Sequence, residues 1–303
     1  MLIVVQASTK VLTTSIATTF TKPSRCSKRN VCMPYLTHDT HRIAYDVQGE
    51  GIPIVFMHGW PTNRMLWHDL TQELGSSYRA ITFDWLGFGE SDKPQDYRFS
   101  FTNKMRELDA VIRETTAPDE PVVLVGHDIG GPPAVLWAEA HPERVRHLFL
   151  LNTMTSTLKS KLDRLSEIAF GIPLLNRLFL SDAGLWRILT TNTRKSGADI
   201  EQRIDRILAH TWDAPISYRR RMIYEPMHLG RRDELRRLTD IVRKLPMRKT
   251  AFIGEHDPLC LIHMNHLVEQ DDTITAIGAD NAGHFVPIDE PQAIALALRM
   301  RVG

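Results

Sequence analysis

The sequence feature that most constrains the fold is a series of short apolar segments separated by longer helical patterns. Most of these segments are rich in β-branched residues and apolar without alternation, as strands buried on both faces are. Helical patterns fill the intervals at about residues 62–75, 101–116, 130–141 and 290–301. This order predicts a mostly parallel sheet covered by helices on both faces. The strand segments are Arg42–Val47, Pro53–Met57, Arg79–Asp84, Val122–Gly126, His147–Leu151, Thr250–Gly254 and Thr273–Gly278.

A helical insertion is expected between the fifth and sixth of these strands. Residues 155–247 have helical periodicity and no convincing strand. The chain has 303 residues, 43% of them apolar, which suffices for a large core with an inserted lid. We therefore predict a core formed by residues 33–154 and 248–303 and a lid formed by residues 155–247. Such a lid would cover the carboxyl edge of the sheet, where open α/β sheets place their sites.

Charge and cysteine content give weaker constraints. The formal net charge is +1, so nothing in the total indicates a nucleic-acid partner. Residues 155–247 hold 18 Lys and Arg against 11 Asp and Glu, which fits either solvated helix faces or attraction of anionic substrates. The three cysteines show no metal-ligand spacing, and a disulfide framework is not expected, which favours a reducing compartment. No run of 18 apolar residues occurs, so no integral membrane segment is expected.

The first 32 residues differ in composition from the rest of the chain. Residues 1–38 contain no Asp or Glu, many Ser and Thr, and several Lys and Arg, as organellar transit peptides do. Residues 1–32 are interpreted as an N-terminal extension: a targeting peptide, a disordered tail, or the result of a start placed before Met33. We expect a cytoplasmic protein, or one of an organelle matrix if the extension is a transit peptide.

The most informative motif lies where the strand Val122–Gly126 meets the next helical pattern. The chain there reads Gly-His-Asp-Ile-Gly-Gly, with Asp128 at the centre of a sharp strand-to-helix turn. Such a turn presents a nucleophile and needs small flanking residues, which Gly126 and Gly130 supply. No G-x-S-x-G occurs in the chain, so a serine nucleophile has no comparable candidate. The alternative is that Asp128 only caps the following helix.

A buried strand followed by Gly126–Gly131 (GHDIGG) resembles the aspartate-nucleophile branch of the α/β-hydrolase family. Epoxide hydrolases, haloalkane dehalogenases and fluoroacetate dehalogenases form that branch. The resemblance covers residues 34–303 and is strong in the motif loops and weak across the lid. It implies the α/β-hydrolase fold, a mostly parallel sheet with helices on both faces and an inserted helical lid. The string at Asp84–Ser91 (DWLGFGES) also matches the family, and we interpret it as structural.

The resemblance assigns two backbone donors near the nucleophile. His58, Gly59, Trp60 and Pro61 follow a strand and match the family's HGxP turn. That turn implies that the N–H of Trp60 and the N–H of Ile129 form an oxyanion hole. His127, inside the nucleophile turn, completes the motif residues. An ordinary turn after a strand is the alternative interpretation of His58–Pro61.

The resemblance also assigns an acid and a base after the last two strands. Asp257 matches the family's acid position, with Glu255 as the alternative. His284 lies in Asn281–Phe285 (NAGHF) and matches the catalytic base, although a lone histidine is more often structural. The chain order Asp128, Asp257, His284 is nucleophile, acid, base, as this fold requires.

These assignments imply a two-step hydrolysis that needs no metal or organic cofactor. A carboxylate attacks an electrophilic sp³ carbon and forms an ester with the enzyme, and an imidazole then activates water against that ester. The expected partners are a small apolar organic substrate and water. A homodimer is compatible with the sequence.

The donor for the leaving group decides between substrates. Tyr218 falls where epoxide hydrolases carry a lid tyrosine that protonates the opening epoxide, with Tyr224 as a substitute; packing of Tyr218 on a lid helix is the alternative. Residues 155–200 contain no tyrosine, so the family's first lid tyrosine has no match. Halide cradles use indole N–H groups, often directly after the nucleophile, where this chain has Ile129.

Three tryptophans are candidates for replacing that halide donor. They are Trp60, Trp186 and Trp212. The family's HGWP form is frequent in epoxide hydrolases, so we predict an epoxide hydrolase first. A haloalkane or haloacid dehalogenase is the second hypothesis. A non-catalytic small-molecule-binding protein of the same fold is the third.

Overall fold

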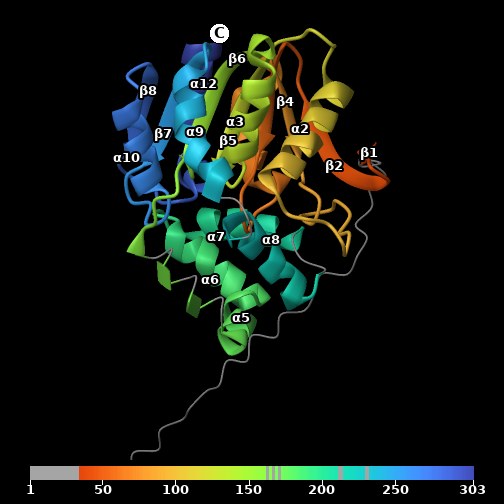
Figure 1. The fold of residues 1–303 in the computed structure, drawn as a ribbon, viewed down its shortest axis with the longest axis vertical. Helices are drawn as coiled ribbons and strands as arrows, with labels where there is room; N and C mark the ends of the chain where they lie inside the picture. The colour runs from red at the N-terminus through yellow and green to blue at the C-terminus, as the bar shows by residue number, and fades with distance from the viewer. Residues whose placement is uncertain (1–33, 162–163, 166–167, 170–171, 211–213, 229–231) are drawn as a thin grey trace, which may run out of the picture. The chain divides into compact units, whose positions relative to one another are not determined.

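The structure is a computed structural model that describes residues 34–161, 164–165, 168–169, 172–210, 214–228 and 232–303 (Figure 1). The N-terminal extension predicted at residues 1–32 and the candidate donor Trp212 lie outside the described residues. Among the described helices, none combines the length and apolar character needed to cross a lipid bilayer.

An eight-stranded sheet forms the centre of the molecule, with strand order β1-β2-β4-β3-β5-β6-β7-β8. β1 pairs antiparallel with β2, and β2 pairs antiparallel with β4, whereas the pairings from β4 through β8 are parallel. The strands are β1 (Tyr35–His38), β2 (His41–Gln48), β3 (Ile52–Met57), β4 (Tyr78–Phe83), β5 (Val122–Asp128), β6 (Val145–Thr153), β7 (Arg248–Gly254) and β8 (Ile274–Ala279).

Helices cover both faces of this sheet, as the continuous apolar strands predict. Along β3, Ile54 and Phe56 enter one hydrophobic cluster while Val55 and Met57 enter the other, because successive side chains point to opposite faces. The helices beside these clusters are α1 (His68–Leu74), α2 (Phe101–Thr115), α3 (Gly131–Ala140), α9 (Arg232–Lys244), α10 (Leu261–Gln270) and α12 (Pro291–Val302). α1 and α12 pack on one face, and α2, α3 and α9 on the other.

Each predicted strand agrees with the structure within two residues at each end, as do the helices α2, α3 and α12, whereas α1 begins six residues later than predicted. The strand β1 and the helices α10 and α11 (Val286–Asp289) were missed. β1 is a four-residue strand at the sheet edge, too short to show a clear alternation. α10 was missed because its buried face includes a histidine, His263, beside Met264 and Leu267.

Four helices of the insertion lie together beyond the end of β5 (Figure 1). They are α5 (Pro173–Phe179), α6 (Asp182–Asn192), α7 (Ala198–Ala209) and α8 (Ile216–His228). The ninth helix, α9, packs instead against α3 and so lies on the face of the sheet. Within the predicted lid of residues 155–247, the part over the carboxyl edge is therefore α5–α8.

Candidate active site

β5 ends at Asp128, which has a backbone φ of 50°, and α3 begins three residues later. A non-glycine residue in this left-handed region is strained, and such strain concentrates at functional sites. The neighbouring glycines have no room for side chains. A Cβ on Gly130 would lie 2.4 Å from the carbonyl oxygen of Met57, and one on Gly126 would lie 2.8 Å from the Cα of Gly131. The turn therefore has the geometry that the sequence predicted.

The carboxylate of Asp128 is held by the two backbone amides that the HGxP and GHDIGG motifs indicated. The N–H of Trp60 donates to Oδ2 at 2.8 Å, and the N–H of Ile129 donates to the same carboxylate. Gly59 permits this approach, since a Cβ there would lie 2.4 Å from the Cβ of Asp128. Burial raises the pKa of Asp128 to about 6, although His284 and the amides oppose the shift.

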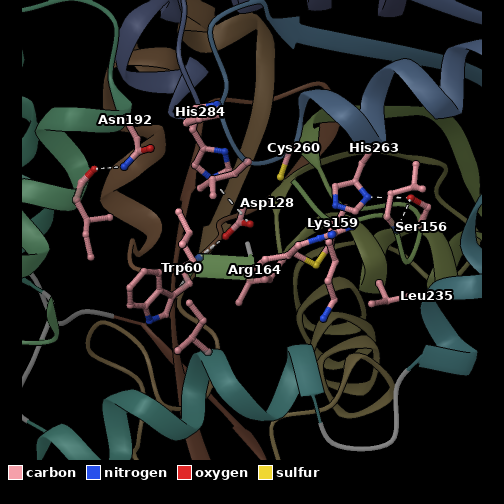
Figure 2. A pocket seen from close by; sticks show the side chains of 18 of the residues that line it. Trp60, Asp128, Ser156, Lys159, Arg164, Asn192, Leu235, Cys260, His263 and His284 are labelled. Atoms are coloured by element: carbon pink, nitrogen blue, oxygen red, sulfur yellow. Dashed lines mark hydrogen bonds and ion pairs between the residues drawn. The ribbon is translucent and has the colours of Figure 1, made fainter. Parts of the chain in front are cut away.

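His284 lies between Asp128 and Asp257 (Figure 2 shows it above Asp128). Its Nδ1 is 3.0 Å from Oδ2 of Asp257, which fixes the tautomer with the proton on Nδ1. Burial opposes ionisation of Asp257, but His284 and the N–H groups of Leu259 and Cys260 hold its pKa below the usual range. Nε2 of His284 is 3.9 Å from Oδ1 of Asp128, too far for a hydrogen bond.

Two side chains from the sheet orient the loop that carries His284. His127 Nε2 lies 2.9 Å from the carbonyl oxygen of His284. Asn152, at the end of β6, donates to the carbonyl of Gly283 at 2.8 Å and accepts the N–H of Gly254 at 2.9 Å. Asn152 was not predicted from the sequence, and its signal is an amide directly after the apolar run Leu148–Leu151 of β6. It joins the ends of β6 and β7 to the histidine loop.

His58, in the HGxP turn, makes contacts that hold neighbouring loops together. His58 is fully buried, and its Nδ1 lies 2.9 Å from the carbonyl of Gly59. Its carbonyl accepts the indole N–H of Trp85 at 2.9 Å. Burial lowers the pKa of His58 to about 3, so the ring is neutral at physiological pH.

A cavity of about 940 Å³ is lined by both Asp128 and His284. Figure 2 shows Trp60 and Cys260 beside them. The helical insertion contributes apolar lining from α5, α6 and α8, and basic lining from the segment after β6 and from α9. The apolar residues are Phe179, Ile188 and Ile223, and the basic residues are Lys159, Arg164 and Arg236. The site is therefore a mostly apolar chamber with part of the insertion's positive charge at its wall.

The two candidate tyrosines occupy different environments. Tyr218 is buried, its hydroxyl donates to the carbonyl of Pro94 at 3.3 Å, and its ring packs edge-on against Phe99. It is not among the described residues that line the cavity, whereas Tyr224 is. The structure thus brings the substitute candidate, and not Tyr218, to the chamber.

The candidate indole donors also separate. Trp60 lines the cavity, while Trp186 is 37% exposed and does not line it among the described residues.

Atoms able to ligate a metal on Asp128, Cys260 and His284 lie within 4.8 Å of one another. The amide and carboxylate hydrogen bonds described above already account for how Asp128 and His284 are held, so we assign no metal to this group.

Comparison with known proteins decides the family. A model of the family described as alpha/beta hydrolase fold matches residues 52–291. The chain belongs to the α/β-hydrolase fold family. This confirms the fold predicted from the sequence, and the match includes the nucleophile turn, the insertion and the loop of His284.

Relatives within the α/β-hydrolase family carry several names. A cis-3-alkyl-4-alkyloxetan-2-one decarboxylase of Shewanella oneidensis is 32% identical over 121 residues, 39% of this chain and 38% of the relative. A haloalkane dehalogenase of Sphingobium indicum is 35% identical over 123 residues, 39% of this chain and 40% of the relative. The chain thus spans about two fifths of the length of these curated relatives.

Solved structures match over most of the chain. The epoxide hydrolase CorEH has a TM-score of 0.71 at 24% identity, covering 88% of this chain and 97% of that one. At this identity the likeness shows the fold alone.

Proposed function

We propose that this protein hydrolyses a small organic substrate through a covalent ester on Asp128, and that the substrate is an epoxide. The observation that carries the proposal is the division of roles between the two carboxylate oxygens. Oδ2 is held by the N–H of Trp60, while Oδ1 lies toward the imidazole of His284. Both residues line the chamber, so a substrate carbon can reach Oδ1.

In the first step Oδ1 of Asp128 attacks an epoxide carbon. The Oδ1–carbon bond forms as the ring carbon–oxygen bond breaks, and the ring oxygen leaves as an alkoxide that needs a proton. Tyr224 is the phenol that lines the cavity, and we assign it as the proton donor. Tyr218, whose hydroxyl donates to Pro94, is the less favoured donor.

In the second step water attacks Cγ of the Asp128 ester. Nε2 of His284 accepts the water proton, and Asp257 stabilises the resulting imidazolium through Nδ1. Negative charge then develops on Oδ2, where the amide of Trp60 already donates, and the amide of Ile129 donates to the same carboxylate. As the intermediate collapses, the ester carbon–oxygen bond breaks and the imidazolium of His284 gives its proton to the leaving diol oxygen. The proton of the new Asp128 carboxyl group restores the phenol of Tyr224, and one water oxygen stays in Asp128.

The same ester chemistry also fits a dehalogenase, in which halide leaves in the first step. Trp60 lines the cavity, and its indole is the group that favours this second candidate. The oxetan-2-one named for the Shewanella relative is a strained oxygen ring, so it belongs in the same substrate screen.

The test is a panel of styrene-type epoxides, chloro- and bromoalkanes and dialkyl oxetan-2-ones, scored for diol, halide and carbon dioxide. Diol release supports the first proposal, and halide release alone replaces it with the second. Carbon dioxide release alone would replace both with decarboxylation. Ligand-dependent thermal stabilisation without any product would instead indicate a binding protein.

The intermediate is tested separately by intact-protein mass. His284→Gln should accumulate protein heavier by the mass of the substrate, because the ester forms and water is not activated. The double variant carrying Asp128→Asn as well is the matched control and should gain no mass. Equal labelling of both would remove Asp128 as the nucleophile.

A further inference from the structure

The loop that carries His284 is attached to the helical insertion as well as to the sheet. The N–H of His284 donates to the carbonyl oxygen of Asn192, the last residue of α6, at 2.8 Å. The contact is close, since a Cβ on Gly283 would lie 2.4 Å from that same carbonyl oxygen. The backbone of the proposed base and the end of α6 therefore meet directly.

Asp289 strengthens this attachment from α11 (Val286–Asp289). Its side chain is buried, and its carboxylate accepts the N–H of Gly283 at 2.8 Å, that of Arg194 at 3.0 Å and that of Lys195 at 2.8 Å. One carboxylate thus bridges the residue before His284 and the connection from α6 to α7. Burial raises the pKa of Asp289, so keeping a charge here has an energetic cost that the amide donors offset.

Neighbouring contacts place the same two segments together at the surface. Lys195 Nζ lies 2.8 Å from Oε1 of Glu290, an ion pair with both side chains partly exposed. Exposed pairs of this kind contribute little. The buried carboxylate of Asp289 is therefore the contact expected to hold the loop.

We propose that Asp289 is a positioning residue that locks His284 to residues 192–195 of the insertion for the second chemical step. The proposal rests on the ester mechanism above. In the first step Asp128 is held by Trp60 and Ile129, and none of those contacts involves Asp289. In the second step Nε2 of His284 must meet a water beside Asp128, and a displacement of about 1 Å in such a geometry can cost on the order of 100-fold in rate.

The variant Asp289→Asn keeps the shape of the side chain but turns an amide NH₂ toward backbone donors. Rapid-quench mass measurements should show ester forming within about 3-fold of the wild-type rate and decaying about 10- to 100-fold more slowly. The result would be accumulation of ester, as in His284→Gln. Glu290→Gln is the matched control and should leave both rates within about 3-fold, because its ion pair is exposed.

Wild-type ester decay in Asp289→Asn, or equal slowing of both steps, would overturn the proposal. A second measurement does not require the variant to fold. In the wild-type protein, amide exchange of residues 192–195 and 283–284 should occur together in one opening event, and unrelated exchange rates would overturn it. Failure of His284→Gln to trap any ester would refute the proposed function instead, which keeps the two failures apart.

Discussion

Asp84 and Asp128 are two buried carboxylates at the carboxyl ends of β4 and β5, the strands on either side of β3, yet their charges are compensated differently. Asp84 accepts the N–H of Arg64 at 2.7 Å and the N–H of Glu90 at 2.8 Å, and it pairs with the guanidinium of Arg64. That guanidinium also pairs with Asp46 and Glu90. In the described part of the chain Asp128 has amide donors and a more distant imidazole, and it faces a cavity.

The difference shows what separates a structural carboxylate from a reactive one. A carboxylate such as Asp84, whose charge is neutralised by a buried cation and hydrogen bonds, stabilises its loop and is a poor nucleophile. The carboxylate of Asp128 is held by amide donors, and its oxygen lone pairs stay available for attack. Burial raises the pKa of Asp128 to about 6. The strings at residues 84–91 and 126–131 both place an Asp at the end of a strand, yet one carboxylate is structural and the other is the proposed nucleophile.

The largest effect is expected when the reactive carboxylate, Asp128, is removed. Asp128→Asn should lower turnover of the best substrate by more than about 10⁴-fold, because an amide oxygen is a poor nucleophile. Steady-state kinetics measures this. Activity that recovers on storage, with a one-dalton mass gain, would indicate hydrolysis of the amide back to Asp; undiminished activity from the start would contradict the mechanism.

The next largest effect is expected when the structural carboxylate, Asp84, is removed. Asp84→Asn should destabilise the protein by about 3–5 kcal/mol, because it removes the fully buried partner of Arg64, and the remaining partners Asp46 and Glu90 are partly exposed and compensate the charge only in part. Urea unfolding measures the loss. Asp46→Asn is the control and should cost less, since the side chain of Asp46 is 31% exposed. Equal losses in the two variants would show that burial of Asp84 is not what matters.

A smaller effect of opposite sign is expected when the reactive carboxylate is neutralised. The folded pKa of Asp128 lies above its ordinary value of 3.8, so its charge opposes folding at high pH and not below about pH 4. Asp128→Asn should therefore stabilise the protein by about 1–3 kcal/mol at pH 8 and by almost nothing at pH 4. A stability difference independent of pH would contradict the assigned pKa.

The smallest effect is expected in the pH dependence of the rate of ester formation. Ester formation requires ionised Asp128, so its rate should fall about tenfold for each pH unit below about 6. Pre-steady-state measurement of ester formation in His284→Gln removes the titration of the base from the profile, and because His284 lowers the pKa of Asp128, the fall should begin at a higher pH in this variant. A rate that stays constant down to pH 4.5 would show that Asp128 has an ordinary pKa.

Much of the sheet and of the site was predicted because its determinants are local. A strand that is buried on both faces is continuously apolar, and a turn as sharp as the one at Asp128 needs glycine where a Cβ would meet backbone. These are properties of a few adjacent residues. Asp257 and His284 were instead assigned by the resemblance of their loops to the family's motifs, and their catalytic roles stay predictions.

The tertiary structure decided what depends on packing between distant segments. The sequence pointed to Tyr218, yet packing against Phe99 turns that side chain away and leaves Tyr224 at the cavity. The connections made by Asn152 and Asp289 join residues more than 90 positions apart, so no local pattern reveals them. Short helices of an insertion are oriented by the surfaces they bury against, and that information exists only once the chain has folded.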